Sequence, residues 1–357
     1  MHVCFDIRKI DFQAFDKPVV SLGTFDGVHL GHQVIIKRLL GRSKEKNKMG
    51  LVVTYEPHPQ SVVAPQSAPQ VLTTLEEKLY FLEKLGVDQT LVINFDKKLS
   101  QLKPEDFLEQ ILVKKLNVGE IIVGHDHAFG KNRSGKIEVL AQASKRYNFE
   151  LEVLPPVYAE KCSNDFVQVG SDEPLSAQTG TRPGGGVRPP ARRERISSTK
   201  IRGEFKEGDF GKGIRMLGHS YPIWGKATKG RGRGKILDYP TINLKTPPEK
   251  LLLKDGVYGT RVQIQDKEYF GMLHIGAKPT FGDSSHSIEA HLFDVDLDLI
   301  DSKIRLFIES WIREVRKFDT PDLLKDQLRI DEKKIKQMFH MRMLVPQSAG
   351  RTFIGIN

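Results

Sequence analysis

Short apolar runs alternate with helical patterns in the first part of the chain, up to Leu154. The strand-like runs are Pro18–Leu22, Leu51–Tyr55, Thr90–Asn94, Ile121–Val123 and Glu150–Leu154. Between them, apolar residues recur at helical spacing in His32–Leu40, Thr74–Leu85, Pro104–Leu116 and Ile137–Tyr147. This alternation predicts an α/β domain with a parallel sheet, helices on both faces and a ligand site at the carboxyl ends of its strands.

Beyond Tyr221 the pattern changes to closely spaced strands with glycine-rich turns. The strand-like segments are Ile223–Ala227, Tyr258–Ile264, Tyr269–Ile275, Ile288–Phe293 and Ile304–Trp311. Five or six such strands without crossover helices predict a small antiparallel barrel. A helix then follows, with Pro321 suited to its first turn.

The stretch from 161 to 195 interrupts both patterns with serine, glycine, proline and arginine. This composition predicts a mobile loop. We therefore expect one domain over residues 1–210 and a second over 215–340, while the tail at 341–357 carries no interpretable signal. Nothing in the pattern indicates an oligomeric state.

The composition is that of an ordinary globular protein with anionic partners. A formal net charge of +10 favours nucleotides, nucleic acid or a membrane surface without choosing among them. The two cysteines lack a partner motif, so a disulfide framework and a zinc site are not expected. We therefore expect the protein in a reducing compartment, the cytoplasm. We expect no membrane span, since no run of about 18 apolar residues occurs.

The most informative segment is Gly23–His32, which reads Gly-Thr-Phe-Asp-Gly-Val-His-Leu-Gly-His. It places His29 and His32 three residues apart at a helix start, where unpaired N–H groups and the helix dipole favour an anion. Gly31 lets a phosphate approach the backbone. Two alternatives stay open: a metal-binding histidine pair, for which no third ligand lies at a recognisable spacing, and simple packing of the turn.

The His-x-Gly-His run resembles the nucleotidylyltransferase signature, and the full ten residues resemble the bacterial bifunctional riboflavin kinase/FAD synthetase family. The resemblance implies a Rossmann-like nucleotidylyltransferase domain followed by a small β-barrel riboflavin kinase domain with a C-terminal helix. It also implies catalytic roles for His29 and His32. Residues implied to contact ATP in the first domain are Gly23, Phe25, Gly31, Arg195, Ser198, Thr199 and Arg202.

Two segments carry the implied flavin contacts of the first domain. Glu56–Pro59 follows a predicted strand, and its two prolines restrict the pose of His58. Gly124–Gly130 is similar to a family segment except that His127 replaces an aromatic residue. The resemblance implies that FMN is bound by His58, Asp126, His127 and Phe129. Arg195–Arg202 is similar to the family's Ile-Ser-Ser-Thr segment, although an ordinary capped helix would also fit.

The second domain carries a separate phosphate signature in Gly225–Leu244, which resembles the riboflavin kinase pattern. The resemblance implies Mg²⁺ and ATP at Thr241 and Asn243, whose side chains face the same side of an extended segment. Asp238 replaces a glycine of the family, and its carboxylate would repel phosphates unless a cation pairs with it. Further implied ATP contacts are Gly230, Gly232, Gly234 and Lys235.

The segment Ser287–Asp294 resembles the strand that holds the family's catalytic base, which implies that Glu289 takes the proton from the attacking riboflavin hydroxyl. A solvated strand carboxylate is the alternative. The segment Arg313–Phe318 is similar to the family in content more than in spacing, and the flavin contacts implied there are Arg313, Glu314 and Phe318.

The resemblance implies an enzyme that phosphorylates riboflavin to FMN and adenylylates FMN to FAD, with ATP as co-substrate, Mg²⁺ as cofactor and release of pyrophosphate. Its expected partners are riboflavin, FMN, FAD and ATP, and neither nucleic acid nor membrane. Two alternatives remain. Only one activity could be retained, or the arginine-rich stretches and the net charge could belong to a basic nucleic-acid-binding module.

Overall fold

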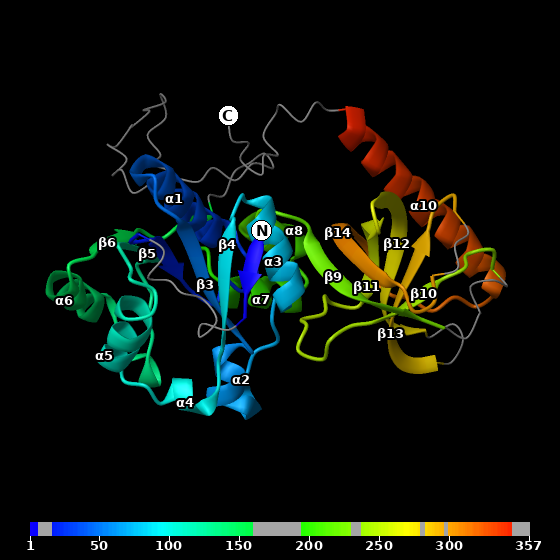
Figure 1. Ribbon diagram of the computed structural model, residues 1–357. Coiled ribbons are helices and arrows are strands. Elements are labelled where there is room, and N and C mark those ends of the chain that lie inside the picture. Colours follow the sequence, from blue (N-terminus) through cyan, green and yellow to red (C-terminus); the bar gives the residue numbers. More distant parts are fainter. Residues whose placement is uncertain (6–15, 160–193, 230–236, 279–282, 296–298, 345–357) are drawn as a thin grey trace, which may run out of the picture. The chain divides into compact units, whose positions relative to one another are not determined.

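The computed structural model describes residues 1–5, 16–159, 194–229, 237–278, 283–295 and 299–344 (Figure 1). Most of the loop predicted at 161–195 and of the tail at 341–357 lies outside these ranges, as do Gly230, Gly232, Gly234 and Lys235. The chain forms two compact units. The first contains Met1–Val71 and Lys78–Ser198, and the second contains Leu72–Glu77 and Thr199–Asn357. The domain boundary at 210–215 stays a prediction.

The first unit is built on a six-stranded parallel sheet with the order β1-β4-β3-β2-β5-β6. These strands are β1 (His2–Cys4), β2 (Val19–Leu22), β3 (Gly50–Glu56), β4 (Gln89–Asn94), β5 (Glu120–Gly124) and β6 (Glu150–Leu154). The chain runs outward from β2 through β3 to β4, and then returns to the other side of β2 for β5. In open α/β sheets, ligands bind at such a reversal of strand order, outside the carboxyl ends of the strands, which here are β2 and β5.

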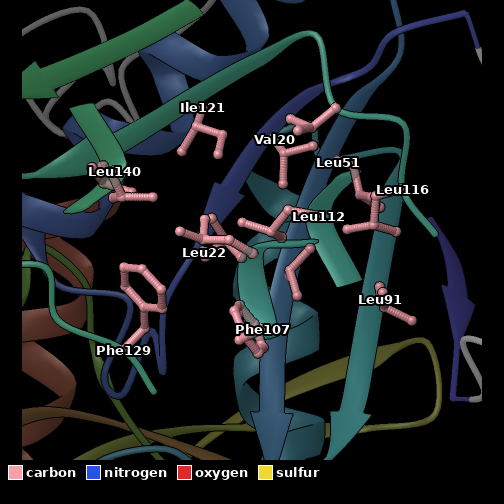
Figure 2. Packing of buried hydrophobic residues seen from close by; sticks show 14 of the residues in the cluster. Val20, Leu22, Leu51, Leu91, Phe107, Leu112, Leu116, Ile121, Phe129 and Leu140 are labelled. Carbon is pink, nitrogen blue, oxygen red and sulfur yellow. The ribbon is translucent and has the colours of Figure 1, made fainter. Parts of the chain in front are cut away.

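Helices follow the strands of the first unit, as the sequence predicts. They are α1 (Leu30–Lys46), α2 (Pro59–Val63), α3 (Leu75–Lys84), α4 (Lys97–Ser100), α5 (Pro104–Phe107) and α6 (Ile137–Tyr147). The prediction of one α-helix over Pro104–Leu116 was wrong in its second half, because Leu108–Val113 is π-helical. Figure 2 shows Phe107, Leu112 and Leu116 in one cluster with strand residues such as Val20 and Leu51.

The second unit is a closed barrel with the order β10-β13-β12-β11-β14-β9, in which neighbouring strands pair antiparallel (Figure 1). Its strands are β9 (Tyr221–Thr228), β10 (Ile242–Lys245), β11 (Gly256–Ile264), β12 (Lys267–Lys278), β13 (Asp283–Leu292) and β14 (Lys303–Arg313). The segment of Thr241 and Asn243, expected to be extended, supplies β10. The barrel and the parallel sheet confirm the predicted fold class.

Three helices accompany the barrel: α7 (Ser198–Glu207) and α8 (Phe210–Leu217) precede it, and α10 (Pro321–Leu344) packs on β12. Ile335 and Phe339 of α10 are buried against Met272 and Phe270 of that strand. Within the described part of the chain, no helix is both long and apolar enough to cross a membrane.

A buried ion pair ties the short segment Leu72–Glu77 into the second unit. Lys250 Nζ lies 2.8 Å from Glu77 Oε2, and both side chains are 0% exposed. The same ammonium group donates to the Leu72 carbonyl at 2.5 Å, while Glu77 Oε1 accepts from the Trp224 amide at 2.9 Å. Each buried charge therefore depends on the other for its stability.

We expect Lys250→Met to destabilise the second unit by about 3 to 5 kcal/mol, because it leaves the Glu77 carboxylate buried without a counter-charge. Urea denaturation followed by tryptophan fluorescence measures this, since both tryptophans of the chain, Trp224 and Trp311, lie in this unit. Adding Glu77→Gln should recover a large part of the loss. A Lys250→Met protein as stable as the wild type would contradict this expectation.

Candidate active sites

The turn after β2 has an unusual backbone conformation. Gly23 continues the sheet by donating to the Val53 carbonyl at 3.0 Å. Phe25, Gly27 and Val28 then adopt φ angles of 47°, 84° and 41°. Left-handed conformations are costly for Phe and Val, but both side chains are buried, and this packing holds them in place. Such strain is concentrated at functional sites, so the turn is a candidate site.

The two histidines of the turn stack on each other. His29 is the N-cap of α1, and its Nδ1 accepts from the His32 amide at 3.4 Å. The ring centroids lie 3.7 Å apart with an interplanar angle of 15°. A Cβ on Gly31 would lie 3.1 Å from His29 Cε1, so glycine at this position also makes room for the stacked imidazole.

His32 is held in its neutral form. Burial lowers the pKa of His32 well below its ordinary value, and the nearby charges of His29 and Lys78 lower it further. The edge of its ring meets Phe25 at a centroid distance of 5.3 Å. Its Nδ1 atom is buried and has no hydrogen-bond partner in the part of the chain that the structure describes. His32 therefore brings a neutral, polar ring to the helix start.

The metal alternative gains no support from the geometry. Among the described residues, no group of three or more His, Cys, Asp or Glu side chains could hold a metal ion. The histidine pair is thus not completed by a third ligand within those ranges.

The second predicted half of this site meets the turn at Ser198. Ser198 Oγ donates to the Asp26 carbonyl at 2.8 Å, which joins the start of α7 to the turn. Thr199 and Arg202 follow on the same helix and belong to the second compact unit. Arg195 lies in the short pair formed by β7 (Tyr158–Ala159) and β8 (Glu194–Arg195), and its guanidinium forms an ion pair with Asp126.

The predicted flavin residues of the first unit lie after β3 and β5, at the same edge of the sheet as the turn. The His127 and Phe129 rings stack with centroids 5.8 Å apart and planes 25° apart. His58 caps α2, with its Nδ1 accepting from the Gln60 amide at 3.3 Å. Burial lowers the pKa of His127 to about 4, with a further contribution from the positive charge of Arg133. At neutral pH His127 is therefore an uncharged ring like the aromatic residue it replaces.

Sequence reasoning missed a buried lysine beside the turn. Lys78 lies on α3, is 5% exposed, and donates to Thr54 Oγ1 at 3.2 Å. A lysine in an amphipathic helix usually faces solvent. Helical spacing, however, places Lys78 on the same face as Leu75, Leu82 and Leu85, and that apolar stripe is the signal that could have found it.

In the barrel, the strand register brings Asn243 and Glu289 together. They are directly opposed on β10 and β13, and His274 of β12 is opposed to Glu289 on its other side. Ile288 and Ala290, the neighbours of Glu289, are buried, so strand alternation turns Glu289 to the outer face of the barrel. Thr241 lies just before β10, two residues from Asn243.

Asp238 has the counter-charge that its position requires. Its carboxylate forms an ion pair with Lys325 of α10, which lowers the pKa of Asp238. Its φ of 60° lies in the left-handed region, which explains why the family has glycine there. A pocket of about 370 Å³ lies beside it, and its lining includes Asp238, Tyr239, Pro240, His291 and Lys325.

The predicted flavin residues of the second unit separate into two groups. Arg313 Nε donates to Asp331 Oδ2 at 2.8 Å, and its guanidinium lies 5.8 Å from the centre of the Phe318 ring. Glu314 instead accepts from Lys254 Nζ at 3.1 Å. Arg313 thus joins the end of β14 to α10, with Phe318 beside it.

Comparison with known proteins assigns each half of the chain to a described domain. Residues 12–164 match the family model of FAD synthetase, and residues 217–339 match that of riboflavin kinase. The chain is 31% identical to the bifunctional riboflavin kinase/FMN adenylyltransferase of Buchnera aphidicola subsp. Schizaphis graminum, over 94% of this chain and 97% of that protein. The Escherichia coli K12 protein of the same description is 31% identical, over 90% and 92%.

A solved structure shares the fold over most of its length. It is described as a macrolide-efflux protein from Streptococcus pneumoniae and superposes with a TM-score of 0.72 at 26% sequence identity. The match covers 91% of this chain and 97% of that one.

We expect acid to destabilise the first unit through His127. Its pKa is lowered from 6.5 to about 4 by folding, so between these values the unfolded state binds the proton and stability falls as the pH falls. His127→Phe removes this contribution. Denaturation at pH 7 and pH 4.5, followed by circular dichroism, should show the variant gaining stability relative to the wild type at the lower pH. A difference that is independent of pH would contradict the prediction.

Proposed function

The chain belongs to the bifunctional riboflavin kinase/FMN adenylyltransferase family, and we propose that it adenylylates FMN at the Gly23–His32 turn and phosphorylates riboflavin at Glu289. Both activities use ATP as co-substrate. The observation that carries the proposal is that one chain contains both features. One unit has a strained turn at a helix start, and the other has Asn243 directly opposite Glu289 on neighbouring strands. The remaining residue roles are assigned from the family pattern and from neighbouring contacts.

Adenylyl transfer requires alignment and charge neutralisation more than covalent help. A phosphate oxygen of FMN attacks the α-phosphorus of ATP, and the bond to the pyrophosphate oxygen breaks. The attacking group is already an anion and needs no strong base. We assign the ATP phosphates to the N-terminus of α1 with His29 and His32, together with Gly23, Phe25 and Gly31, because the unpaired N–H groups there favour an anion.

The family resemblance assigns residues at the start of α7 to the same reaction. Ser198 supports this role through its hydrogen bond to the turn, and Thr199 and Arg202 supply a hydroxyl and a guanidinium for the departing pyrophosphate. Arg195 contributes a further cation. FMN is assigned to the edge formed by His58, Asp126, His127 and Phe129, where the neutral rings of the last pair offer a stacking surface.

The kinase reaction needs a base and a neutraliser of phosphate charge. Glu289 is assigned to take the proton from the terminal ribityl hydroxyl as its oxygen attacks the γ-phosphorus of ATP and ADP leaves. The hydroxyl of Thr241 and the amide oxygen of Asn243 are oxygen donors, which suit Mg²⁺, and the second is directly opposed to Glu289. Bound Mg²⁺ would neutralise charge on the phosphates.

The remaining barrel assignments rest on the family pattern and on neighbouring contacts. Gly230, Gly232, Gly234 and Lys235 are assigned to ATP, although they lie outside the described residues. Arg313, Glu314 and Phe318 are assigned to riboflavin, supported by the contact of the Arg313 guanidinium with the Phe318 ring.

Two observations support retention of both activities. His127 is neutral at physiological pH, and Asp238 is paired with Lys325, so neither departure from the family pattern places an unmatched charge beside a phosphate or a flavin. We propose that the ligands are riboflavin, FMN, FAD and ATP, without nucleic acid or membrane, and that the enzyme works in the cytoplasm, which agrees with two cysteines that lack a partner motif.

We expect His32→Ala to stop the reaction sequence at FMN. Incubation with riboflavin, ATP and Mg²⁺, followed by chromatography, should give FMN and FAD for the wild type and FMN alone for the variant. The variant loses a polar ring at the phosphate-binding turn, so the rate of FAD formation should fall by about 10² or more, the scale for removing one preorganised polar group. A wild type that converts neither riboflavin nor FMN would overturn the proposed function.

We expect Glu289→Gln to have the opposite effect. Without the base, phosphorylation of riboflavin should fall by about 10² to 10⁴. Adenylylation of supplied FMN should continue at the wild-type rate, because Glu289 lies in the barrel. Normal FMN production by this variant would show that Glu289 is a solvated strand carboxylate.

A further inference from the structure

A chain of two hydrogen bonds connects the buried Lys78 to the backbone of the phosphate-binding turn. Lys78 Nζ donates to Thr54 Oγ1 at 3.2 Å, and Thr54 Oγ1 donates to the Thr24 carbonyl at 3.2 Å. Thr54 is 0% exposed and lies near the end of β3, while Thr24 follows Gly23 in the turn. The position of the turn backbone is thus linked, through one hydroxyl, to an ammonium group on α3.

Lys78 and Lys250, both buried, have different partners. Lys250 forms an ion pair with Glu77, as described above. Lys78 instead donates to the neutral hydroxyl of Thr54, and this hydrogen bond uses one of the three N–H groups of its ammonium. A methionine of similar length would fill the same space without the cost of burying a charge. A lysine in this environment is therefore expected to serve a site rather than the core.

The charged and titratable groups around Lys78 come from three elements. Asp26 of the turn and Glu56 at the end of β3 favour its charged form, burial opposes it, and the net result is a pKa of Lys78 below its ordinary value. Lys78 in turn acts on His32 of α1, whose pKa its charge lowers. Lys78 thus interacts electrostatically with groups around the turn where an anion is expected.

We propose that Lys78 is a positioning residue for adenylyl transfer, whose ammonium group holds the Thr24 backbone through Thr54 and adds a positive charge behind the turn that binds the phosphates of ATP. This inference rests on the proposed adenylyltransferase role of the turn. Lys78 is assigned to ATP and not to FMN, because its hydrogen bond to Thr54 connects it to Thr24 in the turn after β2.

The test compares Lys78→Met with Lys84→Met, a matched control on the exposed side of the same helix. With ATP varied, we expect kcat/KM for FAD formation from supplied FMN to fall about tenfold or more in Lys78→Met, the scale of one lost charge-assisted contact. The KM for FMN should stay within about twofold of the wild type, since the flavin contacts are untouched. Riboflavin phosphorylation should not change, and Lys84→Met should match the wild type throughout.

A second variant separates the link from the charge and covers the case in which Lys78→Met fails to fold. Thr54→Val keeps the ammonium group but removes the hydroxyl between it and Thr24. We expect kcat/KM with ATP varied to fall in Thr54→Val, but by less than in Lys78→Met. The KM for FMN should again stay unchanged.

Two results would overturn the inference. One is Lys78→Met with kcat/KM for ATP within twofold of the wild type. The other is a parallel loss toward ATP and FMN together with a lower calorimetric melting temperature of the first unit, which would show a purely structural role. His32→Ala, measured alongside, separates a failure of the role assigned to the turn from a failure of the role proposed for Lys78. If His32→Ala also leaves FAD formation intact, the assignment of the turn itself fails; if only Lys78→Met does, the inference about Lys78 fails alone.

Discussion

The hydrogen-bonded order of the parallel sheet is the constraint on which the first unit depends. Because β2 pairs with β3 on one side and with β5 on the other, the connections after β2 and β5 leave the sheet in opposite directions. The carboxyl ends of both strands stay uncovered by their own crossovers. The Gly23 turn, the Gly124 loop and Arg195, which is paired with Asp126, are brought to one edge by this arrangement although they lie far apart in sequence.

Burial then decides the charge state of the side chains at that edge. His32 and His127 remain neutral because desolvation lowers their pKa values, so they present polar rings without charge. Lys78 is buried beside a neutral hydroxyl, whereas Lys250 in the other unit is matched by Glu77. In the second unit the ion pair of Lys250 with Glu77 offsets the cost of burial, whereas in the first unit Asp26 and Glu56 favour the charged form of Lys78 beside the turn that we propose binds phosphate.

In the barrel, closure of the sheet and the register of its strands bring the proposed site residues together. Six antiparallel strands without an open edge set Asn243 opposite Glu289, although the whole of β11 and β12 lies between these two residues in the sequence. The outer helix α10 supplies Lys325 to Asp238, and Asp331 to Arg313. These pairs explain how two residues close to the proposed site carry charge without disturbing it.

Local pattern by itself determined the α/β unit, the barrel, most element positions and the strand-to-helix turn at Gly23–His32, because periodicity, glycine placement and helix capping are set by neighbouring residues. Glu150–Leu154 and Ile137–Tyr147 match the predicted bounds for this reason. The π-helical turn at Leu108–Val113, the burial of Lys78, the depressed pKa of His127 and the pairing of Asp238 with Lys325 were decided only by the tertiary structure. Each depends on desolvation or on contacts between residues distant in sequence, and a one-dimensional pattern contains neither.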